Sequence, residues 1–217
     1  MEDSFVHPVY SPNVLEFVTV GKEFCSWLES VEVVERELFV DKALKILPLL
    51  YLKATMLPKC ETVLKDPVEK FVDEEHYEAV RNRVLLIMGR FDDYLEVFTA
   101  DMQRSDLPLT STVSENLADI YQDIADFLMN YRTAVTEIMN DALVELTDNF
   151  TTYWGQRVVN VLRALHEAYY GDDDITVPDD EAGVDDIDLL NEEENSKKRD
   201  TSHWLISKMQ HNYRKKE

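Results

Sequence analysis

The stretch TVSENLADIYQDIADFLMNYRTAVTEIMNDALVEL, residues 112–146, decides the fold class, because its apolar residues recur at helical spacing without a proline or glycine. Thr112 or Ser114 is a suitable N-terminal cap for a helix that starts here. The apolar positions are Leu117, Ile120, Tyr121, Ile124, Phe127, Leu128, Tyr131, Val135, Ile138 and Ala142. The pattern predicts one long helix, or two stacked helices, with one apolar face turned toward a core.

Four further segments show helical spacing of apolar residues. They are predicted at about residues 11–28, 34–56, 73–102 and 151–170. Four residues mark their ends or interrupt them. Ser11, before Pro12, and Asp73 are suitable N-terminal caps, Gly171 is a suitable C-terminal cap, and Pro48 predicts a kink or restart in the second helix. Residues 1–170 are therefore predicted to form an all-α helical bundle of five or six core helices.

The composition excludes several other fold classes. The chain has 217 residues but only 5 glycines, and it lacks Asn-Gly, Asp-Gly and any glycine-rich phosphate-binding loop. Because tight turns and phosphate loops depend on such residues, β-sandwiches, dinucleotide-binding domains and P-loop enzymes are excluded together. The two cysteines, Cys25 and Cys60, are too few for a disulfide framework or a zinc site, so free thiols are expected.

The charge of the chain is strongly negative. It has 44 Asp and Glu against 22 Lys and Arg, a formal net charge of −22. Phosphate contacts need clustered bases, so we expect no direct binding to nucleic acid or to anionic membranes. The longest apolar run is seven residues, far short of the roughly 20 that a membrane span needs. No signal peptide is visible at the start, which favours a cytoplasmic location.

The charge also divides the chain into three parts. Residues 1–170 hold 30 acids and 15 bases (net −15), residues 171–199 hold 12 and 3 (net −9), and residues 200–217 hold 2 and 4 (net +2). The middle part is predicted to be a disordered acidic linker. The last part, which contains Trp204, is predicted to be a short amphipathic C-terminal helix that docks on a partner, folds back onto the acidic body, or frays.

Two groups of carboxylates are the candidates for a metal site. One is the string Asp92, Asp93 and Glu96, and the other is a row with four- and three-residue spacing. The members of the row are Asp119, Asp123 and Asp126. At about 100° per residue, this row lies roughly 180–240° from Leu117, and the first string also lies away from its apolar face. We therefore interpret both groups as solvated faces, without a metal or other cofactor. A metal-dependent all-α nucleotide hydrolase stays as the alternative.

The helix predicted at 151–170 carries the candidate partner-binding residues. A polar row beside Trp154 is either an ordinary hydrated face, with Trp154 in the core, or a recognition surface, because Arg and Trp are enriched at binding hot spots. The row is formed by Gln156, Asn160, Arg163 and Glu167, and Arg157 adds charge. The residues predicted to contact a partner are Trp154, Arg157, Asn160, Arg163 and Trp204. No catalytic residue is predicted.

Four blocks of sequence carry a family resemblance. They are RNRVLLIMG (81–89), DDYLEVF (92–98), LADIYQD (117–123) and YWGQRVVNVLRALH (153–166). Over about residues 10–170 the chain resembles an uncharacterised bacterial family of small acidic helical proteins, a domain of unknown function. The resemblance implies no residue roles and at most a place near nucleic-acid metabolism.

The preferred interpretation is a non-enzymatic interaction or accessory protein. Its expected partner is a protein that is basic or associated with nucleic-acid metabolism, since opposite potentials raise encounter rates. The sequence leaves the oligomeric state open.

Overall fold

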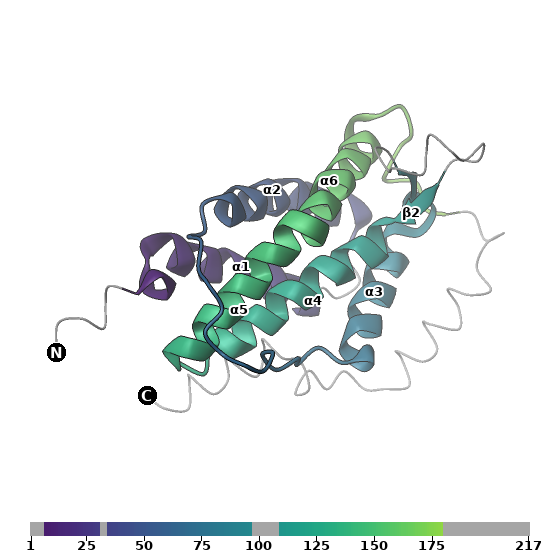
Figure 1. The fold of residues 1–217 in the computed structure, drawn as a ribbon. Helices are drawn as coiled ribbons and strands as arrows, with labels where there is room; N and C mark the ends of the chain where they lie inside the picture. The colour runs from purple at the N-terminus through teal and green to yellow at the C-terminus, as the bar shows by residue number, and fades with distance from the viewer. Residues whose placement is uncertain (1–6, 31–33, 97–108, 180–217) are drawn as a thin grey trace, which may run out of the picture.

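The computed structural model describes residues 7–30, 34–96 and 109–179 (Figure 1). The predicted C-terminal helix at 200–217, with Trp204, lies outside these ranges, as do residues 180–199 of the predicted linker. Within the described ranges, none of the helices combines the length and the apolar character needed to cross a membrane.

Helices dominate the described part of the chain, so the predicted all-α fold is confirmed (Figure 1). Over residues 7–30, 34–96 and 109–179, six α-helices are accompanied by two short 3-10 turns, a π-turn and a two-stranded sheet. In chain order the elements are η2 Pro8–Tyr10, α1 Pro12–Ser30, α2 Arg36–Thr55, α3 Glu74–Met88, η3 Gly89–Phe91, β1 Asp93–Leu95, β2 Thr110–Thr112, α4 Val113–Tyr131, α5 Thr136–Asn149, η5 Phe150–Trp154 and α6 Gly155–Tyr170.

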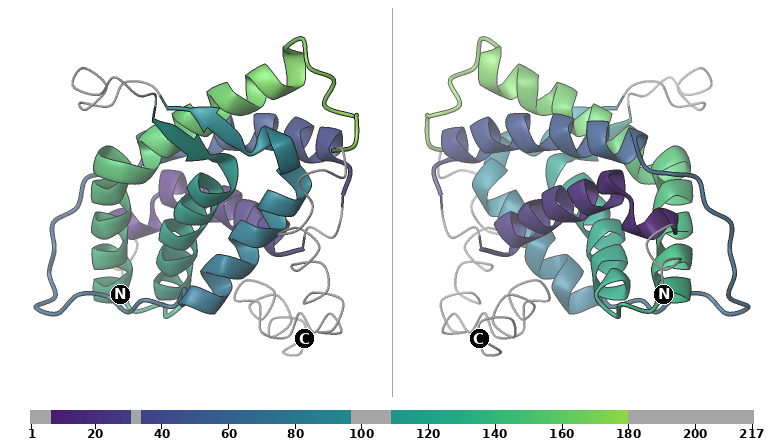
Figure 2. Two further views of the ribbon diagram at one scale, coloured as in Figure 1. Left: turned by 90° about the vertical axis from the view of Figure 1, so that its right-hand side faces the viewer. Right: turned by 90° about the vertical axis from the view of Figure 1, so that its left-hand side faces the viewer.

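Helix α4 is the central helix of the bundle. It contacts α1, α3, α5 and α6, so its side chains meet neighbours on several sides (Figure 2). Its fully or almost fully buried apolar residues are Val113, Leu117, Ala118, Ile120, Tyr121, Ile124, Ala125, Phe127 and Leu128. Phe127 also packs edge-on against Phe17 of α1, with ring centroids 5.8 Å apart. The stretch that decided the fold class in the sequence therefore forms the middle of the core.

The long helical pattern at 112–146 forms two helices, one of the two predicted outcomes. Helix α4 ends at Tyr131, and α5 begins at Thr136. Between them Ala134 has a φ of 57°, a left-handed conformation that is uncommon for a residue with a Cβ atom. Helix α5 then continues into α6 through the π-turn η5, so the predicted separate helix from residue 151 is instead the second half of a bent helix (Figure 2).

The predicted helix caps meet different outcomes. Thr112 accepts the backbone N–H of Glu115 at 3.2 Å and Asp73 accepts that of His76 at 2.9 Å, as predicted. Helix α1 begins at Pro12, but the hydroxyl of Ser11 is buried without a hydrogen-bond partner, so the predicted side-chain cap is wrong. Helix α2 continues through Pro48 to Thr55 without a restart.

The prediction of a helix from residue 73 to residue 102 is wrong over residues 89–96, and residues 97–102 lie outside the described ranges. Gly89 takes a φ of 51°, which ends α3, and a 3-10 turn follows. The chain then forms strand β1, which pairs antiparallel with β2 in the register Asp93 to Thr112, Tyr94 to Ser111 and Leu95 to Thr110. Helical spacing of the apolar residues did not reveal this hairpin, because a strand of three residues is too short to show its own period.

The segment that follows α6 packs against the bundle. Ile175 is 7% exposed, and Arg36 of α2 donates from Nη1 to the carbonyl oxygens of Ile175 and Val177. Arg36 Nη2 also forms an ion pair with Asp179 Oδ2 at 2.9 Å. Residues 171–179 were predicted to start a disordered acidic linker, but these contacts hold them against the body.

Candidate functional site

The carboxylates of Asp92, Asp93 and Glu96 do not share a helix face, because this part of the chain is a turn and a strand. Asp92 is only 2% exposed, and its two oxygens accept the N–H and the hydroxyl of Ser114 at 2.8 and 2.7 Å. Burial raises the pKa of Asp92, and the hydrogen bonds from Ser114 oppose the shift. Asp92 thus caps the start of α4, and its interpretation as a solvated residue is wrong.

The row Asp119, Asp123 and Asp126 does lie on one helix, α4, but each carboxylate has different partners. Asp119 accepts the hydroxyl of Tyr77 at 3.0 Å, while Asp123 accepts the side-chain amide of Asn149 at 2.7 Å. Asp126 is 4% exposed, so its predicted solvated position is wrong. Two of the three acids turn toward neighbouring helices and the third toward an extended segment, because α4 is surrounded by other elements.

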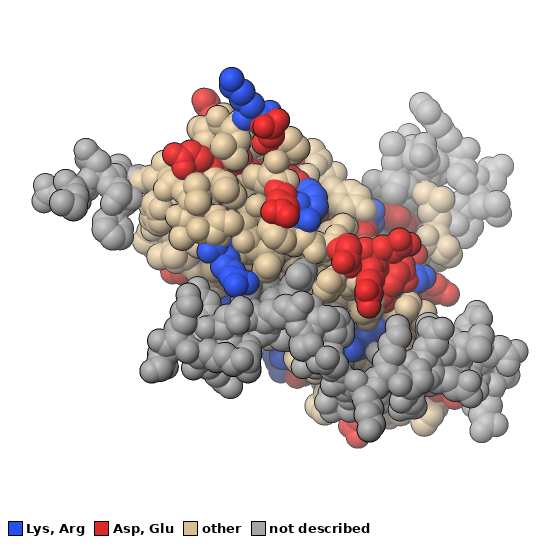
Figure 3. Space-filling view, turned by 90° about the horizontal axis from the view of Figure 1, so that it is seen from below, with Lys and Arg blue, Asp and Glu red and all other residues tan. Residues whose placement is uncertain are grey.

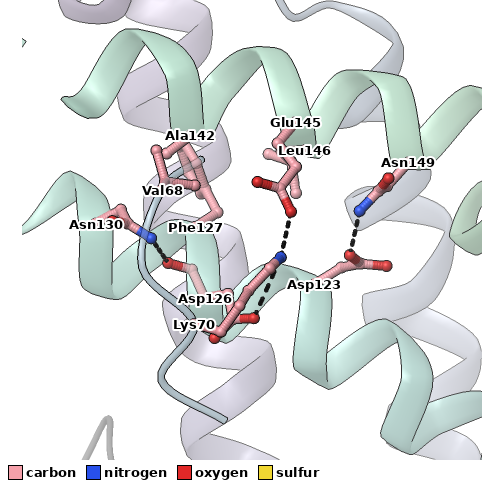
Figure 4. A pocket seen from close by; sticks show the side chains of 10 residues that line it. All are labelled: Val68, Lys70, Asp123, Asp126, Phe127, Asn130, Ala142, Glu145, Leu146 and Asn149. Carbon is pink, nitrogen blue, oxygen red and sulfur yellow. Dashed lines mark hydrogen bonds and ion pairs between the residues drawn. The ribbon is translucent and has the colours of Figure 1, made fainter. Parts of the chain in front are cut away.

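A small pocket between α4 and α5 contains two of these acids (Figure 4). Its volume is about 10 Å³, roughly the space of one water molecule. Lys70 lines it, and its ammonium forms an ion pair with Glu145 and lies 3.6 Å from Asp126 Oδ2 (Figure 4). Burial raises the pKa of both Asp123 and Asp126. A lysine therefore supplies the positive charge at the place where a metal ion would have to bind.

No metal centre emerges from these groups. Within residues 7–30, 34–96 and 109–179, no three His, Cys, Asp or Glu residues are arranged to hold a metal ion. Cys25 is buried and Cys60 is partly buried, and both are free thiols. Burial raises the pKa of both thiols, which lowers the fraction of reactive thiolate.

Arg157 belongs to an internal network of polar side chains. Its Nη1 donates to Asn116 Oδ1 at 2.6 Å, and its Nε lies 3.1 Å from Asp119 Oδ2. The guanidinium also lies 4.0 Å from the ring centroid of Tyr153, whose hydroxyl donates to Asp119 at 2.9 Å. Burial, with the nearby carboxylate of Asp119, raises the pKa of the Tyr77 hydroxyl, so this donor stays protonated. The network fastens the π-turn to α3 and α4.

The structure separates the remaining predicted contact residues. Trp154 is 0% exposed and donates its indole N–H to the carbonyl of Leu146 at 3.1 Å, so it lies in the core. Asn160 is 4% exposed, and its amide donates to Glu96 at 3.2 Å. A partner cannot reach either residue, which corrects their prediction as contacts. Arg163 is exposed and donates to the carbonyl oxygen of Leu95 at 3.0 Å.

Arg163 borders an open groove of about 420 Å³ between α6, strand β1 and the segment after α6. We call it the α6–β1 groove. It is lined by Arg90, Phe91, Asp93, Tyr94, Leu95, Arg163, Ala164, Glu167, Ala168, Asp172 and Asp173. Leu95 is 55% exposed although it is a large apolar residue. The sequence does not reveal this groove, because its apolar spacing predicts a helix at 73–102, whereas Leu95 lies in a strand.

Strand β1 turns one backbone edge away from its partner. The bonds Val113 N–H to Asp92 O and Glu96 N–H to Leu109 O fix which residues pair through hydrogen bonds. In an antiparallel ladder, residues whose backbone groups bond to the partner strand alternate with residues whose groups do not. The backbone groups of Asp93 and Leu95 therefore point away from β2. The hydrogen bond from Arg163 to Leu95 O lies on this outer edge. The groove therefore offers backbone hydrogen-bonding groups beside an exposed apolar side chain.

Comparison with known proteins agrees with this fold. A family model described as a domain of unknown function (DUF5063) matches residues 8–171. The chain is also similar to the crystal structure of protein BF1032 from Bacteroides fragilis, at 44% sequence identity and a TM-score of 0.69. That match covers 77% of this chain and 98% of the Bacteroides chain. No curated protein matches the chain.

Proposed function

Because this chain belongs to the DUF5063 family, a domain of unknown function, we propose its function from its own surface: a non-enzymatic module that binds a protein partner through the α6–β1 groove. The exposure of Leu95 in this groove, beside the outer backbone edge of β1, is the observation that carries the proposal. Peptide segments commonly bind to such edges, where backbone hydrogen bonds provide affinity and side-chain pockets provide specificity.

The charges around the groove favour a basic partner. Four of its lining residues are acids, namely Asp93, Glu167, Asp172 and Asp173, and two are arginines. Both arginines already bind groups of this chain: Arg163 donates to Leu95 O, and Arg90 donates to the carbonyl oxygen of Asp174 at 3.3 Å. Four acids against two arginines give the lining a formal net charge of −2, which complements a segment with lysine or arginine beside apolar residues.

The charge of the whole chain supports the same choice. At −22 it repels nucleic acid, but it attracts basic proteins, including those that themselves bind nucleic acid. Acidic side chains gather on the face seen in Figure 3, where lysines and arginines are scattered singly. We place the interaction in the cytoplasm, where the free thiols of Cys25 and Cys60 would stay reduced.

The alternative of a metal-dependent nucleotide hydrolase gains no support from the described residues. Its two carboxylate groups, at 92–96 and 119–126, are divided among different partners. The ammonium of Lys70 lies among the acids of the small pocket. The arrangement therefore favours the interaction module over an enzyme that holds Mg²⁺.

A capture experiment with a matched pair of variants tests the proposal. The tagged full chain, Leu95→Glu and Leu52→Glu would be incubated with native lysate, and the captured proteins identified by mass spectrometry. Leu52 of α2 is a suitable control, because it is 53% exposed and lies outside the groove. We expect a basic protein to be captured by the wild type and by Leu52→Glu, and to be lost with Leu95→Glu.

Two results would contradict the proposal. The partner could be retained by Leu95→Glu and lost with Leu52→Glu, which would place the contact on the exposed apolar residues of α2. Alternatively, no protein could be enriched by the wild type over Leu95→Glu. Both leucines are more than half exposed, so we expect both variants to stay folded. The melting temperatures of the three proteins check this.

A further inference from the structure

The described chain ends at the rim of the α6–β1 groove. The carboxylate of Asp179 accepts the backbone N–H of Arg90 at 3.2 Å, and Arg90 itself lines the groove. Gly89 permits this approach, because a Cβ atom there would lie 1.7 Å from Asp179 Oδ2. Arg36 Nη2 binds the same carboxylate oxygen at 2.9 Å. The residues after 179 therefore start from a fixed point beside the groove.

The last residues of the chain have the chemistry that this groove favours. Residues 200–217 read DTSHWLISKMQHNYRKKE, with four bases against two acids, in a chain whose other parts are acidic. Their apolar residues include the run Trp204, Leu205 and Ile206. Basic and apolar side chains in one short segment complement the exposed Leu95 and the acidic rim.

The distance along the chain also suits such a contact. Twenty residues, 180–199, separate the fixed point from this segment. As a flexible coil they would have an r.m.s. end-to-end distance of about 25 Å. A short tether of this kind gives a local concentration on the order of millimolar, so even weak affinity fills the site.

We infer that residues 200–217 occupy the α6–β1 groove of their own chain and compete there with the protein partner. This inference rests on the proposed function, since it takes the groove to be a peptide-binding surface. A partner must then displace the segment, and weakening the segment raises the amount of partner bound.

Zero-length carbodiimide cross-linking of the full chain tests the inference. It joins an amine to a carboxylate only when the two are in contact, and peptide mass spectrometry identifies the pair. We expect Lys208, Lys215 or Lys216 to be joined to the rim acids Asp93, Glu167, Asp172 or Asp173. With Leu95→Glu these products should fall about tenfold, because the apolar side chain that the segment would cover is replaced by a charged one, whereas Leu52→Glu should leave them unchanged.

Several outcomes would overturn the inference. They are an absence of cross-links from these lysines, cross-links only to acids outside the groove, and products that join two copies of the chain. A second variant, Trp204→Ser with Ile206→Ser, weakens the segment without touching the folded body, and it should increase partner capture. The cross-links report on the segment alone, and loss of capture with Leu95→Glu reports on the proposed function, so the failure of one is distinct from the failure of the other.

Discussion

Asp126 of α4 accepts a hydrogen bond from the backbone N–H of Phe71, with an N to O distance of 2.7 Å. The same oxygen also accepts the N–H of Val72 at 3.0 Å. Residues 57–72 contain no helix or strand, so their backbone groups need partners from elsewhere (Figure 1). Side chains of α4 and α5 provide such partners, and one of them, Asp126, was interpreted from the sequence as a member of a solvated face.

Three more side chains act in the same way. Asp141 accepts the N–H groups of Val63 and Leu64 at 2.9 and 2.8 Å. Asn140 donates to the carbonyl of Glu61 at 2.7 Å, and Asn130 donates to that of Glu69 at 2.8 Å. The long connection between α2 and α3 is therefore fastened to the bundle by polar side chains.

Replacing Asp141 should loosen this connection. Asp141→Asn removes the charge that receives two backbone N–H groups, and hydrogen bonds to charged groups contribute about 1.5–3 kcal/mol each. We expect the free energy of unfolding near neutral pH to fall by about 2 kcal/mol in urea titrations followed by circular dichroism. Asp148→Asn of the same helix is the control, because Asp148 is exposed and its carboxylate has no hydrogen bond to the described residues. A loss no larger than that of the control would contradict the role of Asp141.

The pH dependence of the Asp141 contribution has a defined sign. Burial alone would raise its pKa, but the N–H groups of Val63 and Leu64 and the amide of Asn140 outweigh burial and hold the pKa below its ordinary value. A lowered folded-state pKa gives stability that is present above the ordinary pKa, about 3.9, and is lost as the pH falls through the folded value. The difference between wild type and Asp141→Asn should therefore shrink only in strongly acidic buffer.

Asp126 should show the opposite pH dependence. Burial raises its pKa above the ordinary value, although the N–H groups of Phe71 and Val72 oppose the shift. The folded state then binds the proton more tightly than the unfolded state, so acidification from about pH 7 toward about pH 4 stabilises the wild type through this group. Asp126→Asn removes this gain. Urea titrations at the two pH values measure it, and an equal pH response in both proteins would contradict the assignment.

Gly155 should resist substitution even though it lies in a helical segment. A Cβ atom there would lie 2.4 Å from the carbonyl oxygen of Phe150, the acceptor of the π-turn. Helix propensity alone predicts that Gly155→Ala stabilises the protein by about 1 kcal/mol. We expect the clash to outweigh this, with a net loss of roughly 1–3 kcal/mol. A lower melting temperature supports the π-turn, and a raised one would exclude this geometry.

Arg157 and Arg163 should respond differently to replacement by alanine. Arg157 is held by Asp119, Asn116 and Tyr153, so Arg157→Ala should lower the free energy of unfolding by about 1–2 kcal/mol. Arg163 is exposed and has one hydrogen bond, to Leu95 O, so Arg163→Ala should change stability by less than about 0.5 kcal/mol. Thermal melting compares the two variants directly. Equal losses would show that the network around Asp119 does not stabilise the fold.

The sequence blocks at 92–98 and 153–166, which carry the family resemblance, contain both exposed and buried residues. Leu95 and Arg163 are exposed at the groove, whereas Trp154 and Asn160 are buried. Sequence spacing correctly placed Arg163 on the surface, because an arginine in a polar row of a helix is usually exposed, and its contact with a partner stays a prediction. It could not separate Asn160 from Arg163, since the burial of Asn160 depends on Glu96 of a distant segment.

The sequence by itself determined the helical class, the helical pattern over 112–146, the cap of α3 at Asp73 and a cap of α4 at one of two neighbouring candidates. These depend on interactions within one or two turns, so the residue pattern contains the information. Only the tertiary structure decided that Asp92 and Asp126 are buried, that β1 interrupts the predicted helix, and that residues 171–179 pack beside a groove. The reason is physical: a carboxylate opposite an apolar stripe meets water in an isolated helix, but in α4 it meets backbone N–H groups of segments far away in sequence.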